Sequence, residues 1–284
     1  MRWQGRKGSS NIEDRRRNRG ARTGGGIGIG VLVIVILGWL LDVDTSFLVN
    51  QQQPGITQTG DIGALDPKEE ETAAQFVSVV LADTETVWTE VFAQQVGINY
   101  RPPVLVLFSG MTQSPCGGAS RATGPFYCPI DNKAYLDTAF FAQMRQQFGA
   151  TGDFAAAYVV AHEIAHHVQF ELGILTKAQE LRSQLDQVQG NQVSVMIELQ
   201  ADCYSGVWAR AAEAQLGTLE PGDLEEALFT AKAIGDDTLQ RQSGGFVRPH
   251  TFTHGTSEQR TRWFAIGYQT GDMRACDTFG AEDL

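Results

Sequence analysis

The sequence predicts an α+β fold that is mostly helical, contains one small antiparallel sheet and is preceded by an N-terminal transmembrane helix. Three observations support this prediction. Apolar residues recur at helical spacing in several segments after residue 67, short apolar runs occur between residues 104 and 136, and residues 24–41 carry no charge. A chain of 284 residues, 42% of them hydrophobic, is long enough to bury one sizeable core.

Charge divides the chain near residue 23. Residues 1–23 hold eight basic residues against Glu13 and Asp14, so their net charge is +6. The whole chain has a net charge of −11, so residues 24–284 carry −17. Phosphate binding needs clustered Lys and Arg on the folded surface, so an acidic body predicts no nucleic-acid partner. We interpret residues 1–23 as a basic cytoplasmic arm.

Residues 24–41 have the length of a membrane span, because 18 residues of helix at about 1.5 Å each cover roughly 27 Å. No small-residue cleavage pattern follows in residues 42–46, which favours an uncleaved signal anchor over a cleaved signal. The preceding arginines place the N-terminus in the cytoplasm and the body beyond the membrane. Gly26 and Gly30 form a G-x-x-x-G pair, which predicts at most a weak homodimer through the span.

Residues 42–66 are predicted to be a linker and residues 67–284 a single domain. An amphipathic helix is expected from Pro67 to about Gln95, and strands at 104–108, 126–128 and 133–136. The following helices are expected from Asp153 as N-cap to about Leu172, over 177–189, over 193–215, and from a Thr256–Gln259 capping box to about Thr270.

The four cysteines all follow the predicted span, and four cysteines allow three pairings. We favour Cys116 with Cys128 across a turn-rich loop, and Cys203 with Cys276 joining the tail to a helix. An exported domain is a setting in which such disulfides persist. The alternative is four reduced thiols, and zinc held by cysteines is not expected because no C-x-x-C pair occurs.

His162 and His166 are four residues apart in an expected helix, so their imidazoles lie on one face and can reach one ion. Zinc accepts such a pair, and Glu163 of this H-E-x-x-H pattern is placed to take a proton from a zinc-activated water. The alternative is a pair of core histidines satisfied by their neighbours. His167 lies about 100° around the helix, so we expect it to pack rather than to bind metal.

A catalytic zinc site usually has three protein ligands and a water, so a third ligand is needed downstream. Glu198 and Asp202 share one face of an apolar helix. One of these acids can bind the metal while the other orients a ligand histidine. Their residue types and spacing leave open which acid does which.

Three segments, AYVVAHEIAHHVQ, ELQADCYSGVWA and THGTSEQRTRWF, resemble the signature blocks of the putative neutral zinc metallopeptidase family, a bacterial group related to the gluzincins. The similarity extends from about Val104 to Cys276 and implies a zincin-like domain anchored in the inner membrane. It also implies one Zn²⁺ per chain and the following roles: His162, His166 and Glu198 as ligands, Glu163 as general base and Asp202 as the partner of a ligand histidine.

His254 precedes the expected capping box and is a candidate catalytic residue, because a histidine or an arginine near the zinc can stabilise an oxyanion. Its alternative role is to fix the local loop. We therefore expect a membrane-anchored zinc endopeptidase that cuts peptide or protein substrates outside the cytoplasmic membrane. The alternatives are a membrane-tethered zinc-binding scaffold or regulator of envelope proteins, and a zinc hydrolase for small amides.

Overall fold

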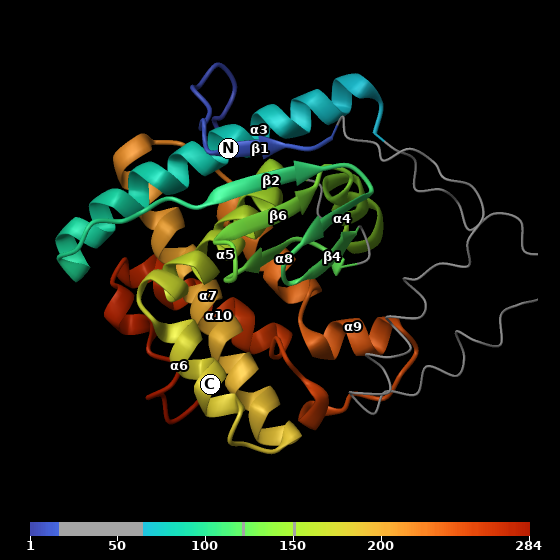
Figure 1. The fold of residues 1–284 in the computed structure, drawn as a ribbon, viewed down its shortest axis with the longest axis vertical. Coiled ribbons are helices and arrows are strands. Elements are labelled where there is room, and N and C mark those ends of the chain that lie inside the picture. The colour runs from blue at the N-terminus through green and yellow to red at the C-terminus, as the bar shows by residue number, and fades with distance from the viewer. Residues whose placement is uncertain (17–64, 121–122, 150–151) are drawn as a thin grey trace, which may run out of the picture. The chain divides into compact units, whose positions relative to one another are not determined.

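The computed structural model describes residues 1–16, 65–120, 123–149 and 152–284 (Figure 1). The expected span at 24–41, with Gly26 and Gly30, lies outside these residues, as does nearly all of the expected linker. Within the described ranges, no helix has both the length and the apolar character needed to cross a bilayer.

A four-stranded sheet in the order β1-β2-β6-β5 forms the upper part of the folded unit in Figure 1. Strand β2 (Val104–Phe108) runs parallel to β6 (Lys133–Asp137) and to β1 (Ile12–Asp14), and only β5 (Phe126–Cys128) is antiparallel to its neighbour. The expected antiparallel sheet is therefore wrong for its main part. The chain between β2 and β6 is long enough for a crossover connection, which permits parallel pairing.

An antiparallel hairpin of β3 (Met111–Ser114) and β4 (Gly117–Ser120) occupies part of that connection. The disulfide Cys116–Cys128 joins this hairpin to β5, with Cα atoms 5.8 Å apart. The second disulfide, Cys203–Cys276, also has the expected pairing. Both predicted pairings are confirmed.

The first residues of the chain are part of the fold. Residues 1–16, here called the N-terminal segment, belong to the same compact unit as residues 65–284. Trp3 packs edge-on against Phe76 with ring centroids 5.4 Å apart, and β1 completes one edge of the sheet. The sequence predicts a separate arm at residues 1–23, whereas these contacts make its first 16 residues a component of the domain.

Helices make up the rest of the unit. They are α3 (Pro67–Val91, continued by one π-helical turn at Phe92–Val96), α4 (Phe140–Phe148), α5 (Asp153–Glu171), α6 (Ile174–Arg182), α7 (Gln187–Leu216), α8 (Asp223–Ala233), α9 (Asp236–Gln242) and α10 (Ser257–Thr270), with 3₁₀ turns at Pro249–Thr251 and Met273–Cys276.

Several helix boundaries differ from expectation, and the helix expected over 177–189 covers Ile174–Arg182. Asp153 is the first residue of α5, and Gly152 is its cap. The expected break at Gly190 does not occur, because Asp186 and Gln189 form a capping box that starts α7 earlier and Gly190 continues the helix. The expected box of Thr256 and Gln259 is present at the start of α10.

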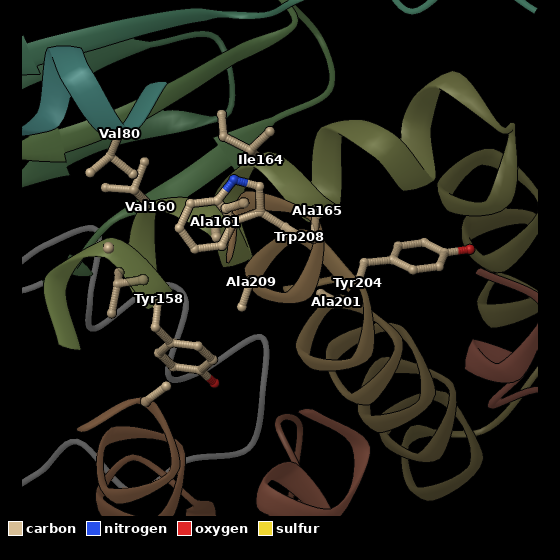
Figure 2. Close-up of a cluster of buried hydrophobic side chains, with 14 of the residues drawn as sticks. Val80, Tyr158, Val160, Ala161, Ile164, Ala165, Ala201, Tyr204, Trp208 and Ala209 are labelled. Atoms are coloured by element: carbon tan, nitrogen blue, oxygen red, sulfur yellow. The ribbon is translucent and has the colours of Figure 1, made fainter. Parts of the chain in front are cut away.

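The core lies where α3, α5 and α7 meet. Figure 2 shows Val80 of α3, Val160 and Ile164 of α5, and Trp208 of α7 converging there, and all four side chains are buried. Helix α5 is apolar on most sides because it is enclosed by neighbours, so its polar residues stand out as candidates for chemistry.

Two glycines set the distance between α7 and α10. A Cβ on Gly206 would meet the Phe264 carbonyl oxygen at 2.1 Å, and one on Gly267 would meet the Cys203 carbonyl oxygen at 1.8 Å. Only glycine allows two helix backbones to approach so closely. This contact brings the first turns of α10 against the part of α7 that carries Asp202.

Candidate metal centre

The structure brings His162 and His166 of α5 together with Glu198 of α7. His162 Nε2 lies 3.0 Å from Glu198 Oε2, and His166 Nε2 lies 3.5 Å from Glu198 Oε1. Tetrahedral zinc with bonds of about 2.0–2.1 Å places its ligand atoms roughly 3.3–3.4 Å apart. These three side chains, here called the metal cluster, therefore fit a zinc ion in both donor type and spacing.

The charges around the metal cluster also favour a bound cation. Burial opposes protonation of His162, but Asp202 and Glu198 outweigh it and raise the pKa of the imidazole to about 10. Burial opposes ionisation of Glu198, yet the two histidines hold the pKa of its carboxyl well below the usual value. The site therefore favours a positive charge between these groups.

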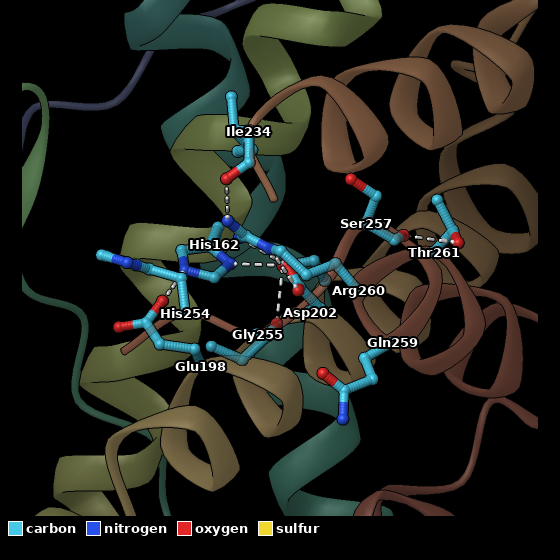
Figure 3. Close-up of polar contacts among 12 residues, drawn as sticks. His162, Glu198, Asp202, Ile234, His254, Gly255, Ser257, Gln259, Arg260 and Thr261 are labelled. Atoms are coloured by element: carbon cyan, nitrogen blue, oxygen red, sulfur yellow. Dashed lines mark hydrogen bonds and ion pairs between the residues drawn. The ribbon is translucent and has the colours of Figure 1, made fainter. Parts of the chain in front are cut away.

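Asp202 orients His162 from behind. Its Oδ1 accepts the Nδ1–H of His162 at 2.9 Å, so Nε2 is the ring nitrogen that faces Glu198 (Figure 3). Asp202 is fully buried. The geometry now distinguishes Glu198 from Asp202, which the sequence leaves interchangeable. Glu198 faces both Nε2 atoms, whereas the oxygens of Asp202 are taken by other donors.

Those donors are Arg260 and Tyr158. Arg260 binds both oxygens of Asp202, with Nε at 2.8 Å from Oδ2 and a terminal nitrogen at 3.0 Å from Oδ1. The Tyr158 hydroxyl also donates to Oδ1. Burial opposes ionisation of Asp202, but Arg260 and His162 overcome it and lower the pKa to about 2. Arg260 therefore acts here as an anchor for Asp202.

His166 is oriented by a neutral side chain. Its Nδ1 lies 2.9 Å from Gln169 Oε1, and the Gln169 amide donates to the Ile197 carbonyl at 2.8 Å and to Gln200 at 3.1 Å. Gln169 is fully buried. The sequence analysis missed this residue, although its position three residues after His166 on an enclosed helix is a usable signal.

Glu163 lies in the cleft beside the metal cluster. The cleft has a volume of about 620 Å³ and is lined by His162, Glu163, His166, Glu198 and His254 among others. Burial raises the pKa of the Glu163 carboxyl, while the nearby histidines lower it. A half-buried carboxylate with a raised pKa is suited to accept and return a proton.

The walls of the cleft are largely apolar. Its apolar lining comes from the sheet and from five helices: Phe126 of β5, Phe140 of α4, Val159 of α5, Leu175 of α6, Ile197 of α7 and Leu239 of α9. Strand β5 is the outer strand of the four-stranded sheet on this side. The cleft therefore combines a polar centre with apolar walls and an adjoining strand edge.

His254 stands at the rim of this cleft, on the loop before α10. Asp236 Oδ2 accepts the backbone N–H groups of Thr253, His254 and Gly255 at 2.8, 2.7 and 3.2 Å. His254 Nδ1 lies 3.3 Å from Asp236 Oδ1, and Gly255 supplies the positive φ of 93° that the turn requires. Asp236 is a second residue that the sequence analysis missed.

The environment of His254 differs from that of the ligands. Its side chain is 51% exposed. Burial opposes protonation, but Asp236 and Glu198 outweigh this effect and raise the pKa of the ring. A protonated ring whose Nδ1–H points to Asp236 has its Nε2–H free to donate to another group.

His167 faces away from the metal cluster, as the sequence predicts. Its ring lies between Tyr100 and Tyr127, and Nε2 donates to the Arg101 carbonyl at 2.7 Å. It therefore packs α5 against neighbouring chain. A separate group of acids is formed by Asp153, Asp223 and Glu226. The Met1 amino group pairs with Asp153 and Asp223, so these acids already have a cationic partner.

Comparison with known proteins agrees with this geometry. A family model described as "Putative neutral zinc metallopeptidase" matches residues 1–279. The uncharacterized protein YpfJ of Escherichia coli K12 is 46% identical over 289 residues, which cover 99% of each chain. The uncharacterized protein Rv2575 of Mycobacterium tuberculosis H37Rv is 48% identical over 197 residues, 66% of this chain and 65% of the relative. No solved structure gives a significant match.

Proposed function

The chain belongs to the putative neutral zinc metallopeptidase family, and from this premise we propose that it is an endopeptidase with one Zn²⁺ held by His162, His166 and Glu198. The observation that carries the proposal is the metal cluster, in which two Nε2 atoms and one carboxylate converge at zinc-like spacing beside Glu163. A zinc ion bound there would polarise the scissile carbonyl and lower the pKa of a water.

The chain's own residues would then perform the proton transfers. Glu163 takes a proton from the attacking water and passes it to the leaving amine. The Nε2–H of His254 donates to the oxygen of the scissile carbonyl as negative charge develops on it. Asp202 and Gln169 keep the ligand histidines in the tautomer that presents Nε2 to the cluster.

Two features favour catalysis by an open site over a closed structural one. The cluster among the described residues contains three protein donors, and a structural zinc site usually has four. The cleft next to it is bordered by β5, an edge strand that can pair with an extended peptide. Both features support a peptide or protein substrate.

The location also belongs to the proposal. Two disulfides favour an oxidising compartment, so we place the site outside the cytoplasmic membrane, to which residues 24–41 attach the chain.

The test is the substitution Glu163→Gln, compared with the parent and with Glu180→Gln on the exposed face of α6. Metal analysis should find one zinc per chain in all three proteins. A proteome-derived peptide library should be cleaved by the parent and the Glu180→Gln control, and about 10²–10⁴-fold more slowly by Glu163→Gln. Equal cleavage by Glu163→Gln would refute the assigned base.

The second candidate function, a zinc-binding scaffold or regulator without proteolytic activity, gives a different result in the same experiment. The parent would bind zinc with the same ligands and leave the whole library uncut.

A further inference from the structure

The N-terminal segment is built into the sheet of the metal domain. In β1, Ile12 pairs with Leu105 and Asp14 with Leu107 of β2. The Leu105 N–H donates to the Asn11 carbonyl at 2.9 Å, and the Arg15 N–H donates to the Leu107 carbonyl at 2.7 Å. With these flanking bonds, β1 is the outer strand of the sheet whose other edge strand, β5, borders the cleft.

An ion pair between Arg6 and a buried aspartate also joins the segment to α3. The two terminal nitrogens of Arg6 bind the two oxygens of Asp83, each at 2.6 Å. Asp83 is only 3% exposed, and the pKa of its carboxyl is raised by burial against the opposing effect of Arg6. Loss of the Arg6 cation with the segment in place would leave this carboxylate buried without its partner, which is strongly unfavourable.

The packing at Gly8 shows how closely the segment fits. A Cβ at this position would meet Ser78 Oγ at 2.0 Å and Ser78 Cβ at 2.9 Å. The Ser9 N–H donates to the Ser78 carbonyl at 2.9 Å. A segment in loose contact with the surface would not require glycine at this position.

These contacts conflict with a single membrane crossing between the segment and the domain. One crossing by residues 24–41 would put residues 1–16 and 65–284 on opposite faces of the membrane, and a cleavage after residue 41 would remove the segment altogether. We propose that residues 1–16 remain in the mature protein and lie on the same side of the membrane as the metal cluster.

Thiol labelling tests the shared location. Ser10 of the segment and Ser243 of the domain are both exposed, and all four native cysteines are in disulfides, so each of Ser10→Cys and Ser243→Cys adds the sole reactive thiol. A membrane-impermeant maleimide is applied to spheroplasts before and after lysis. The two variants should show the same pattern. Labelling of one before lysis and of the other only after lysis would overturn the proposal.

Two further measurements test retention and docking. The intact mass of the purified protein should include residues 1–16, and a mature N-terminus beyond residue 16 would overturn the proposal. Gly8→Val should lower the melting temperature by several degrees, whereas Gly118→Val, at a strand position with no atom near its Cβ, should not. Equal melting temperatures for both variants would show that the segment is not docked.

Discussion

Two histidine–aspartate pairs flank the candidate active site, and their surroundings are opposite in kind. His162 and Asp202 lie on packed helices, and the aspartate is fully buried and bound by the side chains of Arg260 and Tyr158. His254 and Asp236 lie at the rim, where the histidine side chain is 51% exposed and the aspartate is bound mainly by backbone N–H groups of the loop.

This difference in burial explains how the same pair of residue types, histidine and aspartate, can have two different roles. Buried charges interact strongly and cannot be rearranged by water, so the inner pair fixes the direction of a metal ligand. Solvent screens the rim pair, and its loop is held by an acceptor rather than by packing, so its histidine can change protonation and meet a substrate. We expect the inner pair to control zinc affinity and the rim pair to control turnover.

The largest effect should follow Asp202→Asn. The substitution leaves Arg260 buried without its counter-charge, which costs about 3–5 kcal/mol of unfolding free energy. It also weakens the orientation of His162, so zinc affinity should fall about 10–100-fold. Urea unfolding and chelator competition measure the two losses.

Asp236→Asn is the matched control, because the same substitution at the rim should leave zinc affinity unchanged. Equal loss of zinc affinity in both variants would remove the distinction between the two pairs.

The stability of the inner pair at low pH provides an independent check. The folded pKa of Asp202, about 2, lies below the usual aspartate pKa of 3.8, so the stabilisation from its ion pairs is complete above pH 3.8 and is lost as pH falls toward 2.

His254→Ala, which leaves no side-chain donor at this position, should have the next largest effect, and on catalysis alone. Loss of one hydrogen-bond donor to a developing oxyanion lowers kcat about 10²–10³-fold. Zinc affinity and unfolding free energy should equal those of the parent, because the side chain is half exposed and its ring nitrogen Nδ1 pairs with Thr253 and Asp236 rather than with a metal ligand. A parallel loss of zinc would place His254 in the inner group instead.

Tyr158→Phe should have a smaller effect at the inner pair. The change removes one hydroxyl that donates to Asp202 Oδ1 and leaves both bonds from Arg260 in place. We expect a loss of about 1–2 kcal/mol in unfolding free energy, measured by urea titration. A loss as large as that of Asp202→Asn would mean that the hydroxyl, rather than the guanidinium, holds the aspartate.

The smallest effect should be a shift in pH dependence at the rim. Asp236 raises the pKa of His254, so the protonated donor is fully present below about pH 6.5 and is lost as pH rises through the higher folded value. In Asp236→Asn, the fall of kcat/KM at alkaline pH should begin at a lower pH than in the parent. An unchanged profile would show that His254 does not supply the titrating proton.

Local patterns predicted most individual elements. The strand at 126–128, the start of the helix at Pro67 and the capping box of Thr256 and Gln259 agree with the structure. The continuous apolar run Val104–Phe108 is typical of a strand buried on both faces, as in a parallel sheet, but a pattern within one strand does not identify the strand beside it. The contribution of β1 was missed for a related reason, since its partner β2 is about 90 residues away.

At the site, the spacing of His162 and His166 predicts that the two rings share a face, because this follows from the pitch of one helix. Glu198 and Asp202 show the limit of the same argument. Both acids satisfy the spacing, and only the packing of α10 against α7 at Gly206 and Gly267 brings Arg260 onto Asp202 and leaves Glu198 to face the histidines.

The sequence alone therefore determined the chemistry that is available: a histidine pair with its adjacent acid, two further acids on another helix, and the cysteines that form disulfides. The tertiary structure decided how these groups are used. It places Glu198 facing the histidines and Asp202 behind one of them. It also brings Gln169 and Asp236 into contact with His166 and His254, and joins the N-terminal segment to the domain. The physical reason is range, since helix periodicity and capping act over a few residues, whereas these contacts depend on burial and on approaches between segments distant in the chain.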